Sequence, residues 1–220
     1  MRLRHIPGCE EFIASSEDCI SGERVSAYKG RWDELFGKKA KLYIEIGMGK
    51  GQFIRGMADR DREIHFIGIE RYESVLMKAL ERKHQFEEEN GKYNNLFFMC
   101  VDAKKLGECF ARGEVDKIFL NFSDPWPKAR YAKRRLTSPD FMAVYDQILK
   151  EDGVVEFKTD NVDLFAYSLE AIPEAGWEII YQTTDFHAQP ECVDNILTEY
   201  EEKFSKRGQK ICKLIARRKK

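Results

Sequence analysis

From residue 41 onward, short apolar segments alternate with segments of helical periodicity, and this alternation limits the chain to very few folds. Helices that separate strand-like runs in this way are typical of a parallel sheet. Strands are expected at 42–46, 64–69, 96–101, 117–122, 154–158, 177–183 and 211–216. The expected fold class is therefore α/β, with a doubly wound, mostly parallel seven-stranded sheet covered by helices on both faces. Ligands of such sheets bind beyond the carboxyl ends of the strands.

The first forty residues have a different character. They are polar, are interrupted by proline and glycine, and carry one short expected helix at 31–36. We therefore divide the chain into an N-terminal arm with a short helix, residues 1–40, and a main part, residues 41–220, which together form a single domain.

Composition excludes several classes of protein. An apolar content of 43% can fill a sizeable core, so the chain is not disordered. No apolar run approaches the roughly 18–20 residues that cross a bilayer, and none follows Met1–His5, so we expect no membrane span and no signal peptide. The six cysteines form no C-x-x-C pair and no cluster with histidine, which indicates reduced thiols, no metal site and a cytoplasmic protein.

The net charge of −1 conceals two basic runs. Residues 128–135 hold five basic side chains and residues 206–220 hold eight, and neither run contains an acidic residue. Either run alone could be a solvated face or a tail. Together, and with Tyr131 inside the first run, they favour a polyanionic partner, for which nucleic acid is the best candidate.

A glycine-rich turn follows the strand at 42–46, with Glu45 before it and Gly47 and Gly49 inside it. Glycines let the backbone turn sharply and approach a ligand closely. Gln52 stands where a dinucleotide-binding turn needs glycine, and Glu45 would repel a pyrophosphate. Glu70 ends the next strand, where an acid accepts hydrogen bonds from ribose hydroxyls. The pattern favours S-adenosylmethionine, a cationic cofactor without phosphate, over NAD; a plain strand–helix turn is the alternative.

Asp102 follows the strand at 96–101. A carboxylate in this place can accept a hydrogen bond from the exocyclic amine of adenine. The alternative is that Asp102 is an ordinary N-cap of the helix that comes next.

The loop at 121–127, with the sequence NFSDPWP, follows the strand at 117–122. Two prolines stiffen it, and they hold the polar Asp124 beside the flat ring of Trp126, as a site for a planar base would need. Lys128 comes directly after and opens the first basic run. The alternative is a proline-rich turn that is anchored by a buried tryptophan.

Two further motifs with acidic residues contribute hydrogen-bond acceptors for a base. Asp160 follows the strand at 154–158, and Thr198 and Glu201 share one face of an expected helix over 193–205. Guanine presents N–H donors on its Watson–Crick edge, so Asp160 and Glu201 could recognise it. An exposed helix surface is the alternative for the second motif, and we interpret His65 and His187 as structural.

These motifs, in this order, resemble the bacterial tRNA (guanine-N7)-methyltransferase family. The most specific of them are EIGMGKGQF, FIGIE, LNFSDPWPK, KRRLT, FKTDN and TEYEEKF, and the resemblance extends from the MRLRH start through the whole chain. It implies a Rossmann-like class I methyltransferase domain over residues 41–220. It also implies transfer of a methyl group from S-adenosylmethionine to N7 of a guanine at position 46, in the variable loop of tRNA.

The resemblance also implies roles for individual residues. The cofactor would contact Glu45, Glu70, Asp102 and Asp124, with Gly47 and Gly49 in its loop, and Asp124 would be catalytic. The substrate residues would be Lys128, Arg130, Lys133, Arg134, Arg135, Asp160, Thr198, Glu199, Tyr200 and Glu201, of which the arginines and Lys133 contact RNA. No base is needed in this chemistry, because guanine N7 already carries a lone pair.

Three other functions stay open at this point. An enzyme that methylates an exocyclic amine is the first, because D-P-W-P is similar to D-P-P-Y loops, although a tryptophan separates the two prolines here. The second is a non-catalytic RNA-binding subunit, against which the acids at 45, 70 and 124 argue. The third is an NAD-dependent oxidoreductase, against which Gln52 and Glu45 argue. The sequence is compatible with a monomer or a homodimer.

Overall fold

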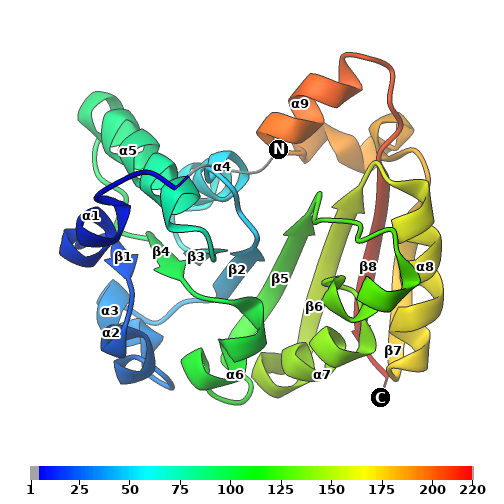
Figure 1. The fold of residues 1–220 in the computed structure, drawn as a ribbon, viewed down its shortest axis with the longest axis horizontal. Coiled ribbons are helices and arrows are strands. Elements are labelled where there is room, and N and C mark those ends of the chain that lie inside the picture. Colours follow the sequence, from blue (N-terminus) through cyan, green and yellow to red (C-terminus); the bar gives the residue numbers. More distant parts are fainter. Residues whose placement is uncertain (1–4, 220) are drawn as a thin grey trace.

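The computed structural model describes residues 5–219 and, within them, an eight-stranded sheet with the strand order β1-β4-β3-β2-β5-β6-β8-β7 (Figure 1). The strands are β1 (Cys19–Ile20), β2 (Leu42–Ile46), β3 (His65–Glu70), β4 (Leu96–Cys100), β5 (Val115–Asn121), β6 (Leu149–Thr159), β7 (Trp177–Thr183) and β8 (Cys212–Arg218). Strand β8 runs antiparallel to β6 and β7, whereas the other neighbours are parallel. The expected α/β class with a doubly wound, mostly parallel sheet is confirmed.

Two expectations lie outside the described residues. They concern Met1–Arg4, where we expect the arm to start without a signal peptide, and Lys220, the end of the second basic run. The helices are α1 (Cys9–Ser15), α2 (Glu23–Ala27), α3 (Trp32–Phe36), α4 (Gln52–Arg60), α5 (Glu73–Asn90), α6 (Leu106–Cys109), α7 (Pro139–Ile148), α8 (Val162–Glu174) and α9 (Glu199–Ser205). Short 3-10 turns lie at η1 (Ala103–Lys105), η2 (Ala129–Arg134), η3 (Phe186–Ala188) and η4 (Pro190–Asp194).

The eighth strand corrects the expected count of seven. Strand β1 belongs to the N-terminal arm and pairs in parallel with β4, so that Cys19 faces Phe98 and Ile20 faces Met99. Two residues are too few to show a strand periodicity, so the sequence pattern did not reveal this pairing. The arm also carries α1 and α2 in addition to the expected helix, which is observed as α3.

The central strands β2 to β5 are buried on both faces, as parallel strands require, whereas one face of the edge strand β7 is exposed. Side chains of α2, α3, α6, α7 and α8 pack on one face, around Ile44 and Ile67. Helices α1, α4 and α5 pack on the other face, around Phe66, Phe98 and Phe119. Because neighbouring residues of one strand point to opposite faces, these strands appear in the sequence as continuous apolar runs.

The strand order reverses between β2 and β5. The chain proceeds from β2 to β3 and β4 on one side, and then returns to place β5 on the other side of β2. Helix α9 lies beyond the arrowheads of β5 and β6, at the same end of the sheet (Figure 1). The fold therefore brings the carboxyl ends of β2, β3, β5 and β6 together with α9. In the part of the chain that the structure describes, no helix is long and apolar enough to cross a membrane.

Candidate active site

The glycine-rich turn joins β2 to α4 in a conformation that only glycine adopts easily. Gly47 and Gly49 have φ values of 75° and 58°, and a Cβ built on either would meet nothing within 4 Å. The Glu70 carboxylate accepts a hydrogen bond from the Gly49 backbone N–H at 3.2 Å, and it also accepts from the N–H groups of Arg71 and Tyr72. Burial raises the pKa of Glu70. The acid at the end of β3 therefore fixes the turn and leaves open space beside its backbone.

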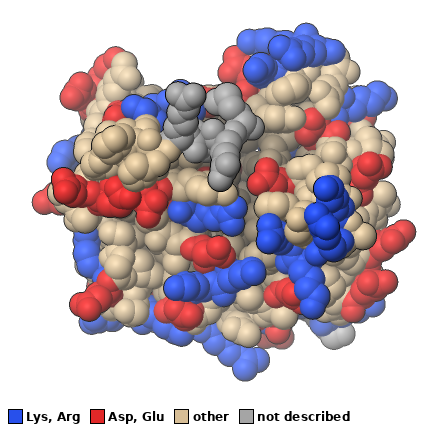
Figure 2. All heavy atoms as spheres, in the orientation of Figure 1, with Lys and Arg blue, Asp and Glu red and all other residues tan. Residues whose placement is uncertain are grey.

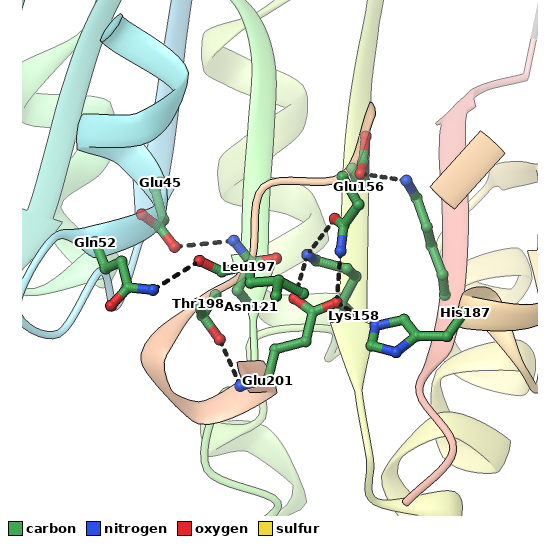
Figure 3. Close-up of polar contacts among 11 residues, drawn as sticks. Glu45, Gln52, Asn121, Glu156, Lys158, His187, Leu197, Thr198 and Glu201 are labelled. Atoms are coloured by element: carbon green, nitrogen blue, oxygen red, sulfur yellow. Dashed lines mark hydrogen bonds and ion pairs between the residues drawn. The ribbon is translucent and has the colours of Figure 1, made fainter. Parts of the chain in front are cut away.

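Glu45 and Asn121 meet at the point where the strand order reverses. Asn121 donates through Nδ2 to Glu45 Oε1 at 2.9 Å, and the Glu45 side chain is only 2% exposed (Figure 3). Within residues 5–219, Glu45 Oε2 and Asn121 Oδ1 are buried without a hydrogen-bond partner. Burial raises the pKa of Glu45 to about 8. A buried acceptor that lacks a partner fits a ligand that brings N–H donors or a positive charge.

Asp102 lies at the end of β4 and has the N-cap geometry that was the alternative interpretation. Its Oδ1 accepts from the Lys104 backbone N–H at 2.9 Å, while its Oδ2 lies 3.9 Å from the Arg71 guanidinium. A capping carboxylate still has lone pairs to offer, so its predicted contact with adenine stays a prediction.

The loop after β5 holds two residues in left-handed backbone conformations. Phe122 has a φ of 53° and Trp126 a φ of 44°, which cost on the order of 1–3 kcal/mol each in residues with bulky side chains. The Phe122 N–H donates to the Lys158 carbonyl of β6 at 2.9 Å. Asp124 lies between the two strained residues and is exposed. Strained backbone of this kind persists only where the surrounding structure maintains it, and it is found mostly at functional sites.

The first basic run forms η2, and its members have two kinds of environment. Lys128, Arg130, Lys133 and Arg134 are exposed, whereas Arg135 is half-buried. Figure 2 shows Lys and Arg side chains gathered over this part of the viewed face. The Arg130 guanidinium lies 4.8 Å from the centre of the Tyr131 ring, and that of Arg134 lies 4.9 Å from Trp126. The run therefore presents a basic, aromatic surface beside Asp124.

A buried ion pair anchors the motif that the sequence analysis assigned to residues 198–201. Lys158, at the end of β6 and 1% exposed, contacts Glu201 Oε2 at 2.7 Å and Asn195 Oδ1 at 3.0 Å (Figure 3). The Glu201 side chain is 0% exposed, and its Oε1 accepts from Asn195 at 2.7 Å and lies 2.8 Å from His187 Nε2. Burial alone would raise the pKa of Glu201, but Lys158, His187 and Asn195 hold it below its usual value.

The expected helix over 193–205 is wrong in its first half. The chain leaves η4, passes through an irregular stretch, and begins α9 at Glu199, where the Thr198 hydroxyl accepts from the Glu201 N–H at 2.9 Å. Thr198 is thus the N-cap, and Glu201 is committed to contacts inside the protein. Its predicted contact with substrate stays a prediction, while His187, which we interpreted as structural, has Glu201 as its partner.

The segment 194–202 also reaches the glycine-rich turn and the helices beside it. Gln52 donates to the Leu197 carbonyl at 3.2 Å, and Glu199 pairs with Lys50 of the glycine-rich turn at 3.5 Å and with Arg82 of α5. This segment therefore links β6 with the helices that follow β2 and β3.

Tyr200 brings the remaining predicted residues together. Its ring lies 5.0 Å from that of Phe122, and its hydroxyl donates to Asp160 Oδ2 at 3.0 Å. The same Asp160 oxygen accepts from Gln209 at 2.7 Å. Burial and the neighbouring Asp160 raise the pKa of Tyr200 to about 12. An aromatic surface and a fixed carboxylate thus lie next to the loop that carries Asp124.

Sequence reasoning missed Lys158, Asn195 and the roles of Asn121 and His187 as partners. A lysine inside an apolar strand was the one available signal, since a buried lysine needs a partner. Elsewhere, the potential metal-ligand atoms of His5, Cys9 and Glu10 lie within 4.8 Å of one another. His5 and Glu10 are exposed, and the expectation of no metal stays a prediction.

Solved structures of methyltransferases share this fold. A 16S rRNA methyltransferase, KamB, aligns with a TM-score of 0.64 over 84% of this chain and 91% of its own, at 14% identity. A structure described as an antibiotic-related methyltransferase aligns with a TM-score of 0.62 over 85% and 91%, at 17% identity. The chain therefore has the fold of class I methyltransferases, with a glycine-rich turn and acids at the carboxyl ends of β2 and β3.

Sequence comparison identifies the family. A family model described as "Putative methyltransferase" matches residues 39–214. Curated proteins named tRNA (guanine-N(7)-)-methyltransferase are 49% identical in Lachnoclostridium phytofermentans, over the whole of both chains, and 44% identical in Bacillus subtilis, over 96% of each. The one from Halalkalibacterium halodurans is 48% identical over 96% of this chain and 93% of its own. The chain belongs to the tRNA (guanine-N7)-methyltransferase family.

Proposed function

We propose that this protein transfers a methyl group from S-adenosylmethionine to N7 of a guanine in the variable loop of tRNA, position 46, and forms 7-methylguanosine. The observation that carries the proposal is the pair of unsatisfied acceptors, Glu45 Oε2 and Asn121 Oδ1, buried beside the glycine-rich turn and directly before the Asp124 loop. The relatives' shared name supplies the substrate. A tRNA substrate also places the protein in the cytoplasm.

The residues at the ends of β2, β3 and β4 fit the cofactor. Burial favours the neutral form of the Glu45 carboxyl group. A bound cationic ligand would favour the ionised form and so offset this effect of burial. Glu70 keeps a carboxylate beside the glycine-rich turn, suited to ribose hydroxyls, and Asp102 can accept from adenine. Gly47 and Gly49 place no side chain over their own part of the turn, so a ligand can approach the backbone there.

S-adenosylmethionine supplies an activated methyl group on a sulfonium centre. The protein needs no base, because N7 of guanine already has a lone pair, and it needs no metal. Positive charge develops on the purine during the reaction, and the carboxylate of Asp124 can stabilise it from the rigid loop. The larger contribution is alignment of the reacting atoms, up to about 7–11 kcal/mol, which a stiff loop and a fixed aromatic surface provide.

The substrate side combines stacking surfaces with charge. Phe122, Trp126 and Tyr200 offer flat rings to a base, and Asp160 offers a carboxylate that Tyr200 and Gln209 hold in place. Lys128, Arg130, Lys133 and Arg134 are exposed where the RNA backbone would pass. Thr198 and Glu201 support this surface from behind, and Glu199 ties it to Lys50.

The test is to incubate the protein with methyl-labelled S-adenosylmethionine and unmodified tRNA, and to identify the labelled nucleoside after digestion. We expect label in 7-methylguanosine, and none when the variable-loop guanosine of the tRNA is replaced by adenosine. Label in an N2-methylated guanosine would assign the enzyme to exocyclic amine methylation. A tRNA that binds but gains no label would identify a non-catalytic RNA-binding subunit.

A further inference from the structure

Arg135 differs from the other members of the basic run in what its side chain contacts. Its Nε donates to the Pro125 carbonyl at 3.0 Å and its Nη2 donates to the Trp126 carbonyl at 3.1 Å. The guanidinium lies 4.2 Å from the centre of the Tyr167 ring of α8. Two adjacent carbonyls of the catalytic loop are therefore held by one planar group, which is itself stacked on an aromatic ring.

The backbone of this loop offers few donors for hydrogen bonds. Pro125 and Pro127 have no backbone N–H, so this stretch can be fixed mainly through its carbonyl oxygens. Trp126 between them has a φ of 44°, a conformation that a bulky residue adopts only when its surroundings impose it. Arg135 donates to the carbonyl that precedes Trp126 and to the carbonyl of Trp126 itself, and so constrains the strained residue.

The backbone of Arg135 is also anchored. Its N–H donates to the Ala132 carbonyl at 3.0 Å, and its carbonyl accepts from Ser138 at 2.9 Å at the start of α7. The loop is thus tied through Arg135 to two helices of the main domain. A side chain used in this way has less freedom to follow an RNA phosphate than the exposed Arg130 or Lys133.

We infer that Arg135 is a positioning residue for the loop that carries Asp124, and that it does not contact the RNA backbone as its place in the basic run implies. The inference rests on the proposed function, since it assigns Asp124 to methyl transfer. Asp124 directly precedes Pro125, so release of the two carbonyls would shift the Asp124 carboxylate relative to the base. A displacement of about 1 Å in a reacting group can cost 10²-fold in rate.

Four variants separate the two roles: Arg135→Gln, Arg135→Lys, Arg130→Gln and Arg112→Gln. Arg112 is exposed in the turn before β5, at the opposite end of the sheet, and serves as the matched control for loss of one charge. For each variant we would measure the single-turnover rate at saturating tRNA and the dependence of the tRNA Kd on salt concentration. Thermal unfolding would confirm that each variant folds.

We expect Arg135→Gln to lower the single-turnover rate about 10–100-fold. Its slope of log Kd against log salt should equal that of the wild type, because no phosphate contact is lost. Arg135→Lys should recover part of the rate, since an ammonium can donate to one of the two carbonyls. Arg130→Gln should instead reduce the slope by roughly 0.7–0.9, the loss of one phosphate contact.

A second readout does not depend on activity. The protein has three tryptophans, and Trp32 and Trp177 are each 2% exposed, so acrylamide quenching of fluorescence reports mainly on Trp126. Arg135→Gln should increase quenching and Arg112→Gln should leave it unchanged. This result would support the inference whether or not the wild-type protein forms 7-methylguanosine. Absence of 7-methylguanosine would contradict only the proposed function.

The inference is wrong if Arg135→Gln keeps the wild-type rate at saturating tRNA and lowers the salt slope as Arg130→Gln does. Unchanged quenching would count against it equally. If Arg135→Gln does not fold, Tyr167→Leu takes its place, because it removes the stacking surface and leaves the guanidinium charge. Tyr167→Leu should then lower the rate and increase the quenching without changing the salt slope.

Discussion

Asn121 donates a hydrogen bond to Glu45 across the junction of β5 and β2, the point at which the order of the strands reverses. The two residues are 76 positions apart in the chain, and each has one buried acceptor that finds no partner among residues 5–219. In a doubly wound sheet this junction is where ligands bind. The pair therefore marks a candidate ligand site by its location and by its unmet hydrogen-bonding capacity.

Glu45 should make the stability of the cofactor-free protein depend on pH. The unfolded chain releases this proton near pH 4.5, whereas the folded chain keeps it up to about pH 8. Between these values the unfolded state binds fewer protons, so the free energy of unfolding falls as pH rises, by up to about 1.4 kcal/mol per pH unit, and levels off above pH 8. Urea unfolding at several pH values measures this.

Glu45→Gln is the matched variant, because Gln cannot ionise. Its stability should vary less with pH over the same interval, and its affinity for S-adenosylmethionine should fall, since a carboxylate is lost. Parallel pH profiles for wild type and variant would show that Glu45 is not the responsible group.

Asp124→Asn should lower the single-turnover rate by about 10²–10³-fold, because the loop then offers no negative charge to the purine. The residue is exposed, so the melting temperature should stay close to that of the wild type. Asp152→Asn, at an exposed position within β6, is the control and should retain full activity. A wild-type rate for Asp124→Asn would remove this residue from catalysis.

Lys158→Met should destabilise the protein by about 3–5 kcal/mol, because it leaves the Glu201 carboxylate buried without its main partner. The double variant Lys158→Met/Glu201→Met should recover most of this loss, since apolar side chains can replace a buried ion pair. Urea unfolding of both variants checks the prediction. A double variant that is less stable than Lys158→Met would contradict it.

Neutralising Arg130, Lys133 and Arg134 together should weaken tRNA binding and reduce its salt slope by roughly 2–3, while S-adenosylmethionine binding stays unchanged. The control is a triple variant with the same loss of charge at exposed positions near the opposite end of the strands: Arg31→Gln, Lys39→Gln and Arg112→Gln. Equal effects of the two triple variants would mean that general charge, and not this patch, attracts the RNA.

Where local pattern decides the structure, the sequence was sufficient. The strand at 42–46 was located from its apolar run, and Glu45, Glu70 and Asp160 were recognised as residues at the ends of strands. The helix expected at 193–205 shows the limit. Val193, Ile196, Leu197 and Tyr200 have helical spacing, but Lys158 and Gln52 bind the chain at Asn195 and Leu197 and hold it outside a helix.

By itself the sequence determined the class of fold, the order of its motifs and the edge of the sheet at which they gather, because periodicity and turn residues act over a few positions. Only the tertiary structure decided which of those residues are exposed at that edge and which are buried and hold the others in place. Glu201 is buried against Lys158, 43 positions away, and Arg135, which was expected to contact RNA, donates to two carbonyls of the loop that precedes it. Such partners are set by distance in space, and neither hydrophobic periodicity nor residue type encodes that distance.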